Sequence, residues 1–521
     1  MLNFGYESIG HLVIDKAERN GDRTLLRFGD TRVSYRDFNL LTNRVAHSFR
    51  ALGIGKDSRV AIVLWNDLWP MVVWVALAKL GAWSVFVNPH YKGASLEVLI
   101  AKADPDALIV AADVLDNVLG TEAGRAVKLL LVHGETGGTR LSELADNADS
   151  SDVSAVRSPG EVAGLIHTSG TTGTPKYCLL SHNYYLSLGM IRMRQLAPSP
   201  DDVFYLPMPL YHSHKHLMGP MVADAAMAIS ARFSVSRFWT EVADYEATIL
   251  LLHDQPMVML LNAPPGPADR AHRARVTHPG FRRHREFHDR FGVDVANMIG
   301  SNESQSIALS CRYRSHADPA YYTEEQPGLE IMHDVVDVRI VDTDGTDVPP
   351  GKSGEILSRQ KHPHTRFEGY YNDKAATDRA FYGDWYRHGD LGRIDDRGLL
   401  HFIGRKADSI RHRGEWIPQE IVEDAATSHP AVAAAALVGV GTDLGDEDLK
   451  LFVEPAAGAC DPAELLDHIA ARVPYFMVPR YVQLIDGLPR TPGLEKITRR
   501  ALSTDVEDAW DRERAGYVVR R

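Results

Sequence analysis

The sequence predicts an α/β protein with a large N-terminal domain of parallel βαβ layers, a small β-rich subdomain and a small, mobile α+β C-terminal domain. Two observations lead to this expectation. Short β-rich runs alternate with helical runs through the first half of the chain, and beyond about residue 330 short strands are separated by turn signals. Such alternation is typical of parallel sheets that helices cover on both faces. A chain of 521 residues is also longer than one ordinary domain.

The first half is expected to alternate between helices and strands. Helices are predicted where apolar residues recur at helical spacing, and strands where short β-rich runs occur. The expected helices span 38–53, 70–80 and about 95–103, and the expected strands span 59–65, 83–87 and 107–112. Further apolar runs at 163–166, 222–230 and 248–252 continue the pattern.

The pattern changes in the second half. VVDVRIV, GEILSR and LLHFIG predict short strands, and DTDGTD, PPGKSG and DDRG predict the turns between them. Further on, helices are expected near 418–428 and 462–472, with strands in AAAALVGV, LKLFVEP and YVQLIDGLP. We therefore expect an N-terminal domain over 1–404, whose β-rich subdomain spans about 330–404, and a mobile C-terminal domain over 405–521.

Composition limits the partners and the location. The net charge of −12 leaves no overall basic surface for nucleic acid. The most apolar segment, 69–87, is interrupted by Lys79 and Gly81, whereas a bilayer-spanning helix needs ~20 apolar residues. The first residues lack the features of a signal peptide, and the cysteines have neither CxxC nor disulfide spacing. We therefore expect a cytoplasmic protein without a membrane span.

Residues 167–176, HTSGTTGTPK, follow the apolar run VAGLI and have the composition of an anion-binding loop. Gly170 and Gly173 allow the backbone to turn with its N–H groups exposed, and Lys176 adds a positive charge. A Walker A loop is excluded, because that motif needs glycine before the lysine and Ser or Thr after it, and here the neighbours are proline and Tyr177. The segment therefore predicts phosphate binding by a different kind of loop.

The same segment resembles the phosphate-binding loop of the adenylate-forming superfamily, which includes acyl-CoA synthetases, firefly-type luciferases and the adenylation domains of peptide synthetases. Further motifs follow in the order of that family: LPMPLYHSH at 206–214, IGSNE at 299–303, WYRHGDLG at 385–392, GRKADSIRHRGEWIPQEIVE at 404–423 and LPRTPGLEKITRR at 488–500. The segments FSVSRFWTEVADYEATI and DAWDRERAGYVVRR are most similar to the carnitine- and fatty-acid-CoA ligase branch.

The resemblance implies two half-reactions. An acid attacks the α-phosphate of MgATP to give an acyl-adenylate and pyrophosphate, and after rotation of the C-terminal domain a thiol, usually coenzyme A, accepts the acyl group. Thr172 and Glu303 would hold Mg²⁺. Lys496 would bridge the carboxylate and the α-phosphate, and His212 would gate the acid site. The implied ATP-binding residues are Thr168, Ser169, Gly170, Thr171, Thr172, Gly173, Lys176, Ser301, Asn302, Asp390 and Arg405.

Each implied role has a chemical rationale. Glu303 offers hard carboxylate oxygens of the kind that Mg²⁺ prefers. Asp390 is an acceptor-only carboxylate that suits the two ribose hydroxyls, with Arg405 assisting at the ribose or phosphate. Lys496 is a point charge on a flexible stem, which suits charge that develops at one place in the transition state.

Several positions depart from the family pattern. Tyr177 replaces a glycine beside the phosphates, and Ile299 replaces the aromatic residue that stacks on adenine. Ala407 occupies the hinge position, Trp416 lies where the pantetheine tunnel would pass, and one extra residue precedes Lys496. ATP binding is therefore expected to be retained, whereas several changes fall where the thiol half-reaction takes place.

The expected acid site is polar, with HSHKH at 212–216 and LLHDQP at 251–256, whereas a tunnel for a long fatty acid would be mostly apolar. We therefore expect a small aromatic or charged acid. The candidate substrate residues are His212, His214, Lys215, His253, Asp254 and Gly300. Alternatively, His212, His214 and His216 at period two could share one strand face and bind a metal.

Three functions remain open at this point. The first is a ligase that uses ATP and Mg²⁺ to join a small polar or aromatic carboxylic acid to coenzyme A. The second is an adenylating enzyme of specialised metabolism with another acceptor, such as ATP- and nitrite-dependent diazotisation of an aryl amine. The third, a non-catalytic nucleotide sensor, is disfavoured by the retained Thr172, Lys176, Glu303, Asp390 and Lys496. The oligomeric state is open between a monomer and a homodimer.

Overall fold

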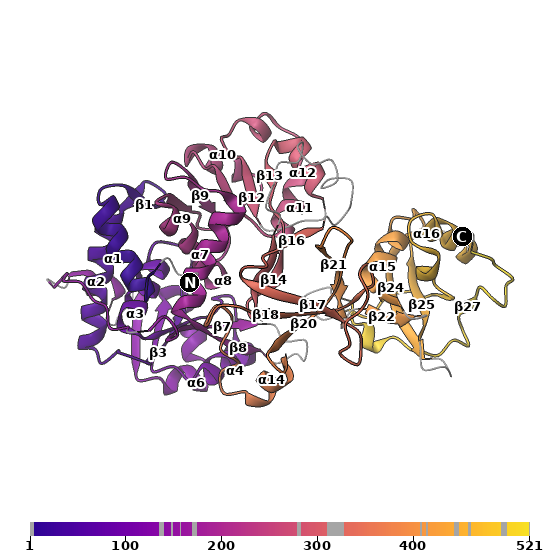
Figure 1. Ribbon diagram of the computed structural model, residues 1–521, viewed down its shortest axis with the longest axis horizontal. Coiled ribbons are helices and arrows are strands. Elements are labelled where there is room, and N and C mark those ends of the chain that lie inside the picture. The colour runs from indigo at the N-terminus through magenta and orange to yellow at the C-terminus, as the bar shows by residue number, and fades with distance from the viewer. Residues whose placement is uncertain are drawn as a thin grey trace. The chain divides into compact units, whose positions relative to one another are not determined.

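The computed structural model of the protein consists of two compact units (Figure 1). It describes residues 5–134, 140–146, 149–156, 158–168, 175–278, 283–309, 328–406, 409–412, 415–441, 447–456, 460–490 and 497–519. The first unit comprises Met1–Val338 and Ser358–Tyr386, and the second comprises Arg339–Leu357 and Arg387–Arg521. The domain boundary expected near residue 404 stays a prediction.

The first unit contains two sheets that are largely parallel. One sheet has the order β6 (Leu129–His133), β5 (Ala107–Ala111), β3 (Arg59–Val63), β4 (Trp83–Phe86), β7 (Val162–Thr168) and β8 (Lys176–Ser181). The other has the order β13 (Asp294–Val295), β12 (Val276–His278), β11 (Ile249–Leu251), β9 (Val203–Leu206), β10 (Ala226–Ile229), β1 (Thr24–Phe28) and β2 (Thr31–Ser34). The end pairs β7–β8 and β1–β2 are antiparallel, and the other described pairs are parallel. The α/β class expected from the sequence is confirmed.

Helices connect these strands, as βαβ units require. Their bounds in the first unit are α1 (Ile9–Asn20), α2 (Tyr35–Ala51), α3 (Trp69–Leu80), α4 (Gly93–Ala103), α5 (Leu115–Leu119), α6 (Glu122–Ala126), α7 (His182–Leu196), α8 (Leu210–Ser213), α9 (Met218–Ala223), α10 (Phe238–Asp244), α11 (Asp254–Asn262), α12 (His284–Phe291) and α14 (Lys374–Arg379). The helices expected near 38–53, 70–80 and 95–103 correspond to α2, α3 and α4 and are confirmed.

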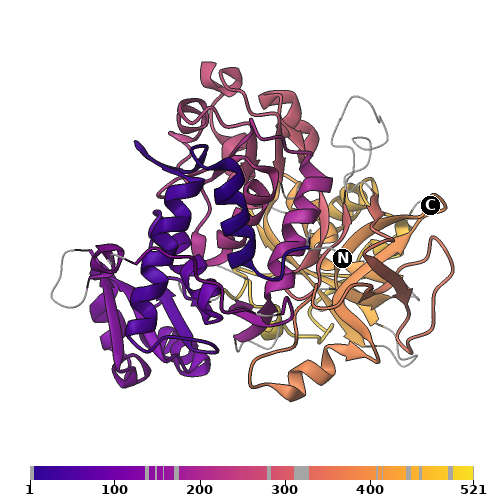
Figure 2. The same cartoon turned by 60° about the vertical axis from the view of Figure 1, so that its left-hand side comes forward.

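Helix α3 is buried all round, as its composition predicts. Residues 70–80 are all buried, and the helix lies beside α1 and α2 (Figures 1 and 2). The helix ends at Gly81, which has the left-handed φ of 71° that favours glycine. Lys79 is accommodated because its Nζ donates to the Oδ1 atoms of Asn39 and Asn43, both at 2.6 Å, and burial lowers its pKa to about 7. In the described part of the chain, no helix is long and apolar enough to cross a bilayer.

Further antiparallel strands follow in the first unit. β14 (Met298–Ser301) pairs with β15 (Gln305–Leu309), and β15 pairs with β16 (Leu329–Ile331). Strands β17 (Val336–Val341), β18 (Gly354–Gln360) and β20 (Trp385–Ile394) each have residues in both units, and β19 (Phe381–Tyr382) pairs with β20.

The second unit has its own α+β core. β24 (Val432–Gly441) pairs antiparallel with β25 (Glu447–Pro455), which pairs parallel with β26 (Tyr481–Leu484), and β27 (Trp510–Asp511) completes this described sheet. Helices α15 (Gln419–Thr427) and α16 (Pro462–Ala470) contribute to the same apolar core. Two antiparallel pairs precede it: β20 with β21 (Leu399–Arg405), and β22 (Ser409–His412) with β23 (Glu415–Pro418). This arrangement matches the α+β pattern expected for the C-terminal part.

Candidate active site

The predicted phosphate-binding loop connects two paired strands. β7 and β8 are antiparallel, and Thr168 at the end of one faces Lys176 at the start of the other. Ser169, Gly170, Thr171, Thr172 and Gly173 lie between them, outside the described residues. The register holds both ends of the loop close together, as an anion-binding turn requires.

Tyr177 does not stand beside the phosphates as the sequence led us to expect. Successive side chains of a strand point to opposite faces, so Tyr177 and Lys176 diverge. The Tyr177 side chain is 2% exposed, and its hydroxyl donates to the carbonyl oxygen of Leu99 at 3.2 Å. The expectation was wrong because this tyrosine is a core residue, anchored to α4.

The segment that contains Tyr370 runs along β8. The Leu179 amide donates to the Gly369 carbonyl at 2.9 Å, and the Tyr371 amide donates to the Tyr177 carbonyl at 2.8 Å. This pairing brings the Tyr370 ring under Lys176, whose Nζ lies 5.0 Å from the ring centroid. Cation–π attraction of this kind helps to fix the direction of a flexible lysine.

Glu303 is held in the turn between β14 and β15. The Ser301 hydroxyl accepts hydrogen bonds from the amides of Glu303 and Ser304, both at 3.2 Å. Glu303 is 8% exposed, and its Oε1 accepts a hydrogen bond from the Tyr370 hydroxyl at 3.0 Å. Burial and the nearby Glu303 raise the pKa of Tyr370, so this hydroxyl stays protonated and donates to the carboxylate.

Tyr370 was not identified from the sequence. Its position depends on pairing between β8 and a segment almost two hundred residues later. The signal available was the aromatic run FEGYY between the IGSNE and WYRHGDLG motifs, which by itself is equally compatible with a packed core.

Gly300 has a structural reason to be glycine. A Cβ atom at this position would lie 1.9 Å from the carbonyl oxygen of Gln305 across the β14–β15 pair. Gln305 itself has a positive φ of 60°, and the register shifts between Ile299 and Gly300. The substrate role expected for Gly300 stays a prediction, and the close backbone approach shapes the turn that carries Glu303.

Lys215 and Asn302 come together next to Glu303. The Lys215 Nζ donates to the Oδ1 of Asn302. Burial and the positive charge of Arg192 lower the pKa of Lys215 to about 8, and the negative charge of Glu303 opposes this shift. The site therefore contains an ammonium group that is partly removed from solvent and can bind a carboxylate.

His212 is half-buried close to another histidine. The centroid of its ring lies 5.0 Å from that of His167, and burial, reinforced by the positive charge of Lys215, lowers its pKa to about 3. His212 is therefore a neutral imidazole near pH 7. His253 and Asp254 are exposed at the start of α11, so their expected contact with the substrate stays a prediction.

His214 is a buried core residue, and the substrate contact expected for it stays a prediction. Its ring stacks on Phe86 at 4.0 Å between centroids and meets the edge of Trp74 at 5.0 Å. Its Nδ1 is 3.1 Å from the Leu210 carbonyl oxygen and its Nε2 is 3.5 Å from the Tyr185 hydroxyl. Both ring nitrogens are thus already engaged inside the protein.

The alternative of a histidine metal site on a strand is also wrong. Residues 210–217 form α8 and a 3₁₀ helix, so positions at period two do not share one face. In the described residues, no group of three or more His, Cys, Asp or Glu side chains is arranged to hold a metal ion.

Asp390 and Arg405 form a pair in the second unit. They are directly opposite each other in the β20–β21 register, and Arg405 Nη1 lies 2.9 Å from Asp390 Oδ1. Asp390 is buried, and the preceding Gly389 has a positive φ of 66°, so the carboxylate follows a backbone position within β20 that favours glycine. The structure brings together the two residues expected at the ribose, and their role stays a prediction. Lys496, Ala407 and the Trp416 side chain lie outside the described residues.

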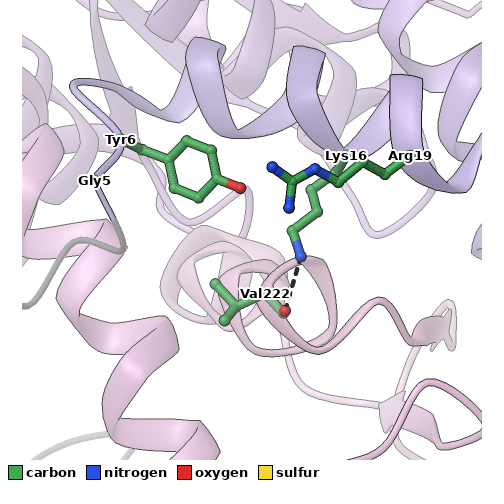
Figure 3. Close-up of a pocket in the computed structure, with 5 residues that line it drawn as sticks. All are labelled: Gly5, Tyr6, Lys16, Arg19 and Val222. Carbon is green, nitrogen blue, oxygen red and sulfur yellow. Dashed lines mark hydrogen bonds between the residues drawn. The ribbon is translucent and has the colours of Figure 1, made fainter.

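A separate pocket lies elsewhere in the first unit (Figure 3). It has a volume of about 280 Å³, and its lining residues are Gly5, Tyr6, Lys16, Arg19 and Val222. The Lys16 ammonium donates to the Val222 carbonyl at 3.0 Å and to Asp224 at 2.6 Å. None of the residues expected to bind ATP or the acid lines it.

Comparison with known proteins identifies the family. Residues 13–371 match the sequence profile described as AMP-binding enzyme, and residues 421–493 match the profile of the AMP-binding enzyme C-terminal domain. The chain belongs to the AMP-binding enzyme family. The resemblance on which the expected ATP site rests is therefore confirmed, and the protein is an ATP-dependent, AMP-forming ligase.

Relatives within the AMP-binding enzyme family are CoA ligases. A medium/long-chain-fatty-acid–CoA ligase of Mycobacterium tuberculosis is 29% identical over 96% of this chain and 87% of its own length. A crotonobetaine/carnitine–CoA ligase of Salmonella paratyphi A is 26% identical over 93% of this chain and 97% of its own length. The fold agrees with that of ATP-bound MatB from Rhodopseudomonas palustris, which has a TM-score of 0.78 and 22% identity, with 94% of this chain and 98% of MatB covered.

Proposed function

We propose that this AMP-binding enzyme activates a small polar or aromatic carboxylic acid and transfers the acyl group to coenzyme A. The observation that supports the size and polarity of the acid is the pair of Lys215 and Asn302 beside Glu303. An ammonium group with a lowered pKa next to the reaction centre attracts a carboxylate, whereas a site for a long alkyl chain is lined mainly by apolar side chains.

The first half-reaction joins the acid to AMP. A carboxylate oxygen attacks the α-phosphorus of ATP, and the bond between that phosphorus and the bridging oxygen of pyrophosphate breaks. The electron pair of the broken bond leaves with pyrophosphate, so the step needs no oxidant and no net proton transfer. Lys176, at the end of the β7–β8 loop, is suited to stabilise the charge that develops on pyrophosphate. Lys496, which lies outside the described residues, is assigned to the reacting carboxylate and α-phosphate.

Glu303 fits a ligand of Mg²⁺. Its carboxylate is largely buried, and Tyr370, its neutral hydrogen-bond donor, engages Oε1 and leaves further lone pairs on both oxygens. When bound, Mg²⁺ would neutralise phosphate charge and orient the triphosphate. Thr172 is the second expected ligand, and it remains a prediction because it lies outside the described residues.

The second half-reaction moves the acyl group to a thiol. The thiol sulfur attacks the acyl carbon, the bond to the AMP oxygen breaks, AMP departs with the electron pair, and the thiol proton passes to solvent. Coenzyme A is the acceptor that the names of the relatives favour. The paired Asp390 and Arg405 are assigned to the ribose and the adjacent phosphate of the nucleotide.

A pyrophosphate-release assay tests this proposal. The purified protein is given ATP, Mg²⁺ and a panel of small aromatic, polar and long-chain acids, with and without coenzyme A, and thioesters are identified by mass spectrometry. We expect pyrophosphate release with a small acid and a thioester when coenzyme A is present. Release without thioester formation would overturn coenzyme A as the acceptor, and a preference for long-chain acids would overturn the assigned acid.

A further arm of the same assay contains nitrite and aryl amines. The relatives are CoA ligases and do not favour diazotisation, so we expect no nitrite-dependent release. Release that requires both nitrite and an amine would replace the proposed function with the diazo-forming alternative.

A further inference from the structure

Arg192 is a buried guanidinium with few partners. It lies on α7 and is 4% exposed. Its Nη1 donates to the Oε1 of Gln195 at 2.6 Å, and Gln195 is held in turn because its Nε2 donates to the Asn297 carbonyl at 3.0 Å. Its Nε is buried, and none of the residues that the structure describes accepts a hydrogen bond from it.

Two other arginines in the same unit, Arg275 and Arg290, have hydrogen-bond partners for every guanidinium nitrogen. All three nitrogens of Arg275 donate to oxygens, with Asp202 as the ionic partner. All three nitrogens of Arg290 do the same, with Asp269 as the ionic partner. Buried polar groups are normally paired in this way, and buried charges almost always are. Arg192 differs, because in the described part of the chain it forms no ion pair with an Asp or Glu carboxylate.

The side chains around Arg192 are cationic or neutral. His216 and His278 are 9% and 1% exposed, and their ring centroids are 6.3 Å apart. The Nδ1 atom of each is buried and has no hydrogen-bond partner among the described residues. Burial and the charge of Arg192 lower the pKa values of both histidines, which are therefore neutral. Helix α7, which carries Arg192, packs against the 3₁₀ helix of residues 214–217, which carries Lys215 and His216. The charge of Arg192 also lowers the pKa of Lys215.

This cluster adjoins the reaction centre through Lys215. Lys215 donates to Asn302, which precedes Glu303, so one end of the cluster reaches the residues assigned to ATP and Mg²⁺. A guanidinium presents a planar fork of donors that matches a carboxylate and binds it in a bidentate manner. The buried Arg192 Nε, a donor without a partner among the described residues, therefore points to an anion at a second position in the acid site.

We propose that Arg192, assisted by Lys215, binds a second carboxylate of the acid substrate, so that the protein activates a dicarboxylic acid at one end. The inference rests on the proposed function, since it names the class of acid for the same site. The carboxylate at the Arg192 end stays ionised and unreacted, while the other attacks the α-phosphorus of ATP.

The test compares matched acids that differ only in the second carboxylate. Pyrophosphate release is measured for butyrate against succinate and for benzoate against isophthalate, with the wild-type protein. In at least one of the two pairs, we expect kcat/KM for the diacid to exceed kcat/KM for the monoacid on the order of 10- to 100-fold. This range is typical of a hydrogen bond to a charged group. Equal or higher values for both monoacids would overturn the inference.

Two variants on the same helix distinguish a substrate-binding role of Arg192 from a purely structural role. Arg192→Met removes the guanidinium at similar length, and we expect it to bring the ratio of diacid to monoacid kcat/KM towards one. Arg194→Gln is the matched control, because Arg194 is more exposed and pairs with Asp334. We expect this control to keep the wild-type ratio. A fall in both rates that leaves the ratio unchanged in Arg192→Met would mean a structural arginine and overturn the inference.

A ligand-protection measurement on the wild-type protein covers the case in which Arg192→Met does not fold. We expect succinate or isophthalate to raise the thermal unfolding midpoint without ATP, and the matched monoacid to have no effect. Equal protection by both members of each pair would overturn the inference.

Three further outcomes show whether the inference or the proposed function is wrong. If formate or nitrite added to a monoacid restores the rate of the diacid, the anion is a free ion and not part of the substrate, which overturns the assignment. If monoacids and diacids support pyrophosphate release equally well, this inference is wrong and the proposed function is retained. If no acid supports pyrophosphate release from ATP, both the proposed function and this inference are wrong.

Discussion

At the scale of single residues, Tyr370 connects the lysine of the predicted phosphate loop to the carboxylate assigned to Mg²⁺. Its ring supports Lys176 and its hydroxyl donates to Glu303. Tyr370→Phe keeps the ring and removes the hydrogen bond. We expect kcat/KM for pyrophosphate release to fall about tenfold, since a hydrogen bond to a charged group contributes ~1.5–3 kcal/mol. Tyr371→Phe is the control, because the contacts of Tyr371 are made by its ring and its backbone. Equal losses in both variants would contradict the role of Tyr370.

Lys215 sets a pH dependence at the same scale. Its pKa of about 8 in the folded protein lies below the ordinary 10.5, chiefly because of burial. Between these values the unfolded chain binds more protons, so this group makes the free energy of unfolding rise with pH. Its charge disappears over the same range, and we expect KM for the acid to rise about fivefold between pH 8 and pH 9. Steady-state kinetics of the wild type and of Lys215→Arg, which stays charged, check this. An identical rise in both proteins would exclude Lys215 as its cause.

At the scale of elements, the turn between β14 and β15 positions Asn302 and Glu303. Gly300→Ala would place a Cβ atom 1.9 Å from the Gln305 carbonyl, and this clash involves backbone that cannot rotate away. We expect a loss of about 1–3 kcal/mol in the free energy of unfolding, together with a loss of pyrophosphate release that exceeds tenfold. Denaturant unfolding and the release assay measure the two effects. Gly266→Ala is the control, since nothing lies within 4 Å of a Cβ there. An active, stable Gly300→Ala protein would contradict the geometry of this turn.

Elements with strong local patterns were predictable, and contacts between distant segments were not. The buried helix α3 followed from an apolar run between a proline and a glycine, because composition and end signals agree there. The segment containing His214 was misread as a possible strand, because alternating histidines fit period two while the backbone is helical. Tyr177 was assigned to the phosphates because the sequence does not reveal which face of β8 points inward.

The candidate site was predictable in its residue types more than in its geometry. The motifs indicated Lys176, Glu303, Asp390 and Arg405, and the structure pairs the last two directly. The contact of Tyr370 with Glu303 could not be predicted, because it depends on the pairing of β8 with a segment that is distant in the sequence. The small number of hydrogen-bond partners of Arg192 could not be predicted, because the spacing of residues in the sequence does not show which side chains surround it.

At the scale of the whole molecule, the roles that we propose fall on residues of both units. Lys496 belongs to the C-terminal motif, and the role proposed for it concerns adenylation alone. We expect Lys496→Ala to abolish pyrophosphate release from ATP and the acid, while thioester formation from supplied acyl-adenylate and coenzyme A is retained. Single-turnover assays of each half-reaction measure this separation. Equal loss of both would remove Lys496 from the assigned role.

The hydrogen bonds between β8 and residues 368–371 have a consequence for synthesis on the ribosome. Lys176 and Glu303 emerge from the exit tunnel well before Tyr370 does, and the Phe367 amide that donates to the Glu303 carbonyl at 2.8 Å also arrives late. A nascent chain that stops short of this stretch has the nucleotide loop without its aromatic support. We therefore expect the arrangement of Lys176 and Glu303 around Tyr370 to form only after residue 371 has been synthesised.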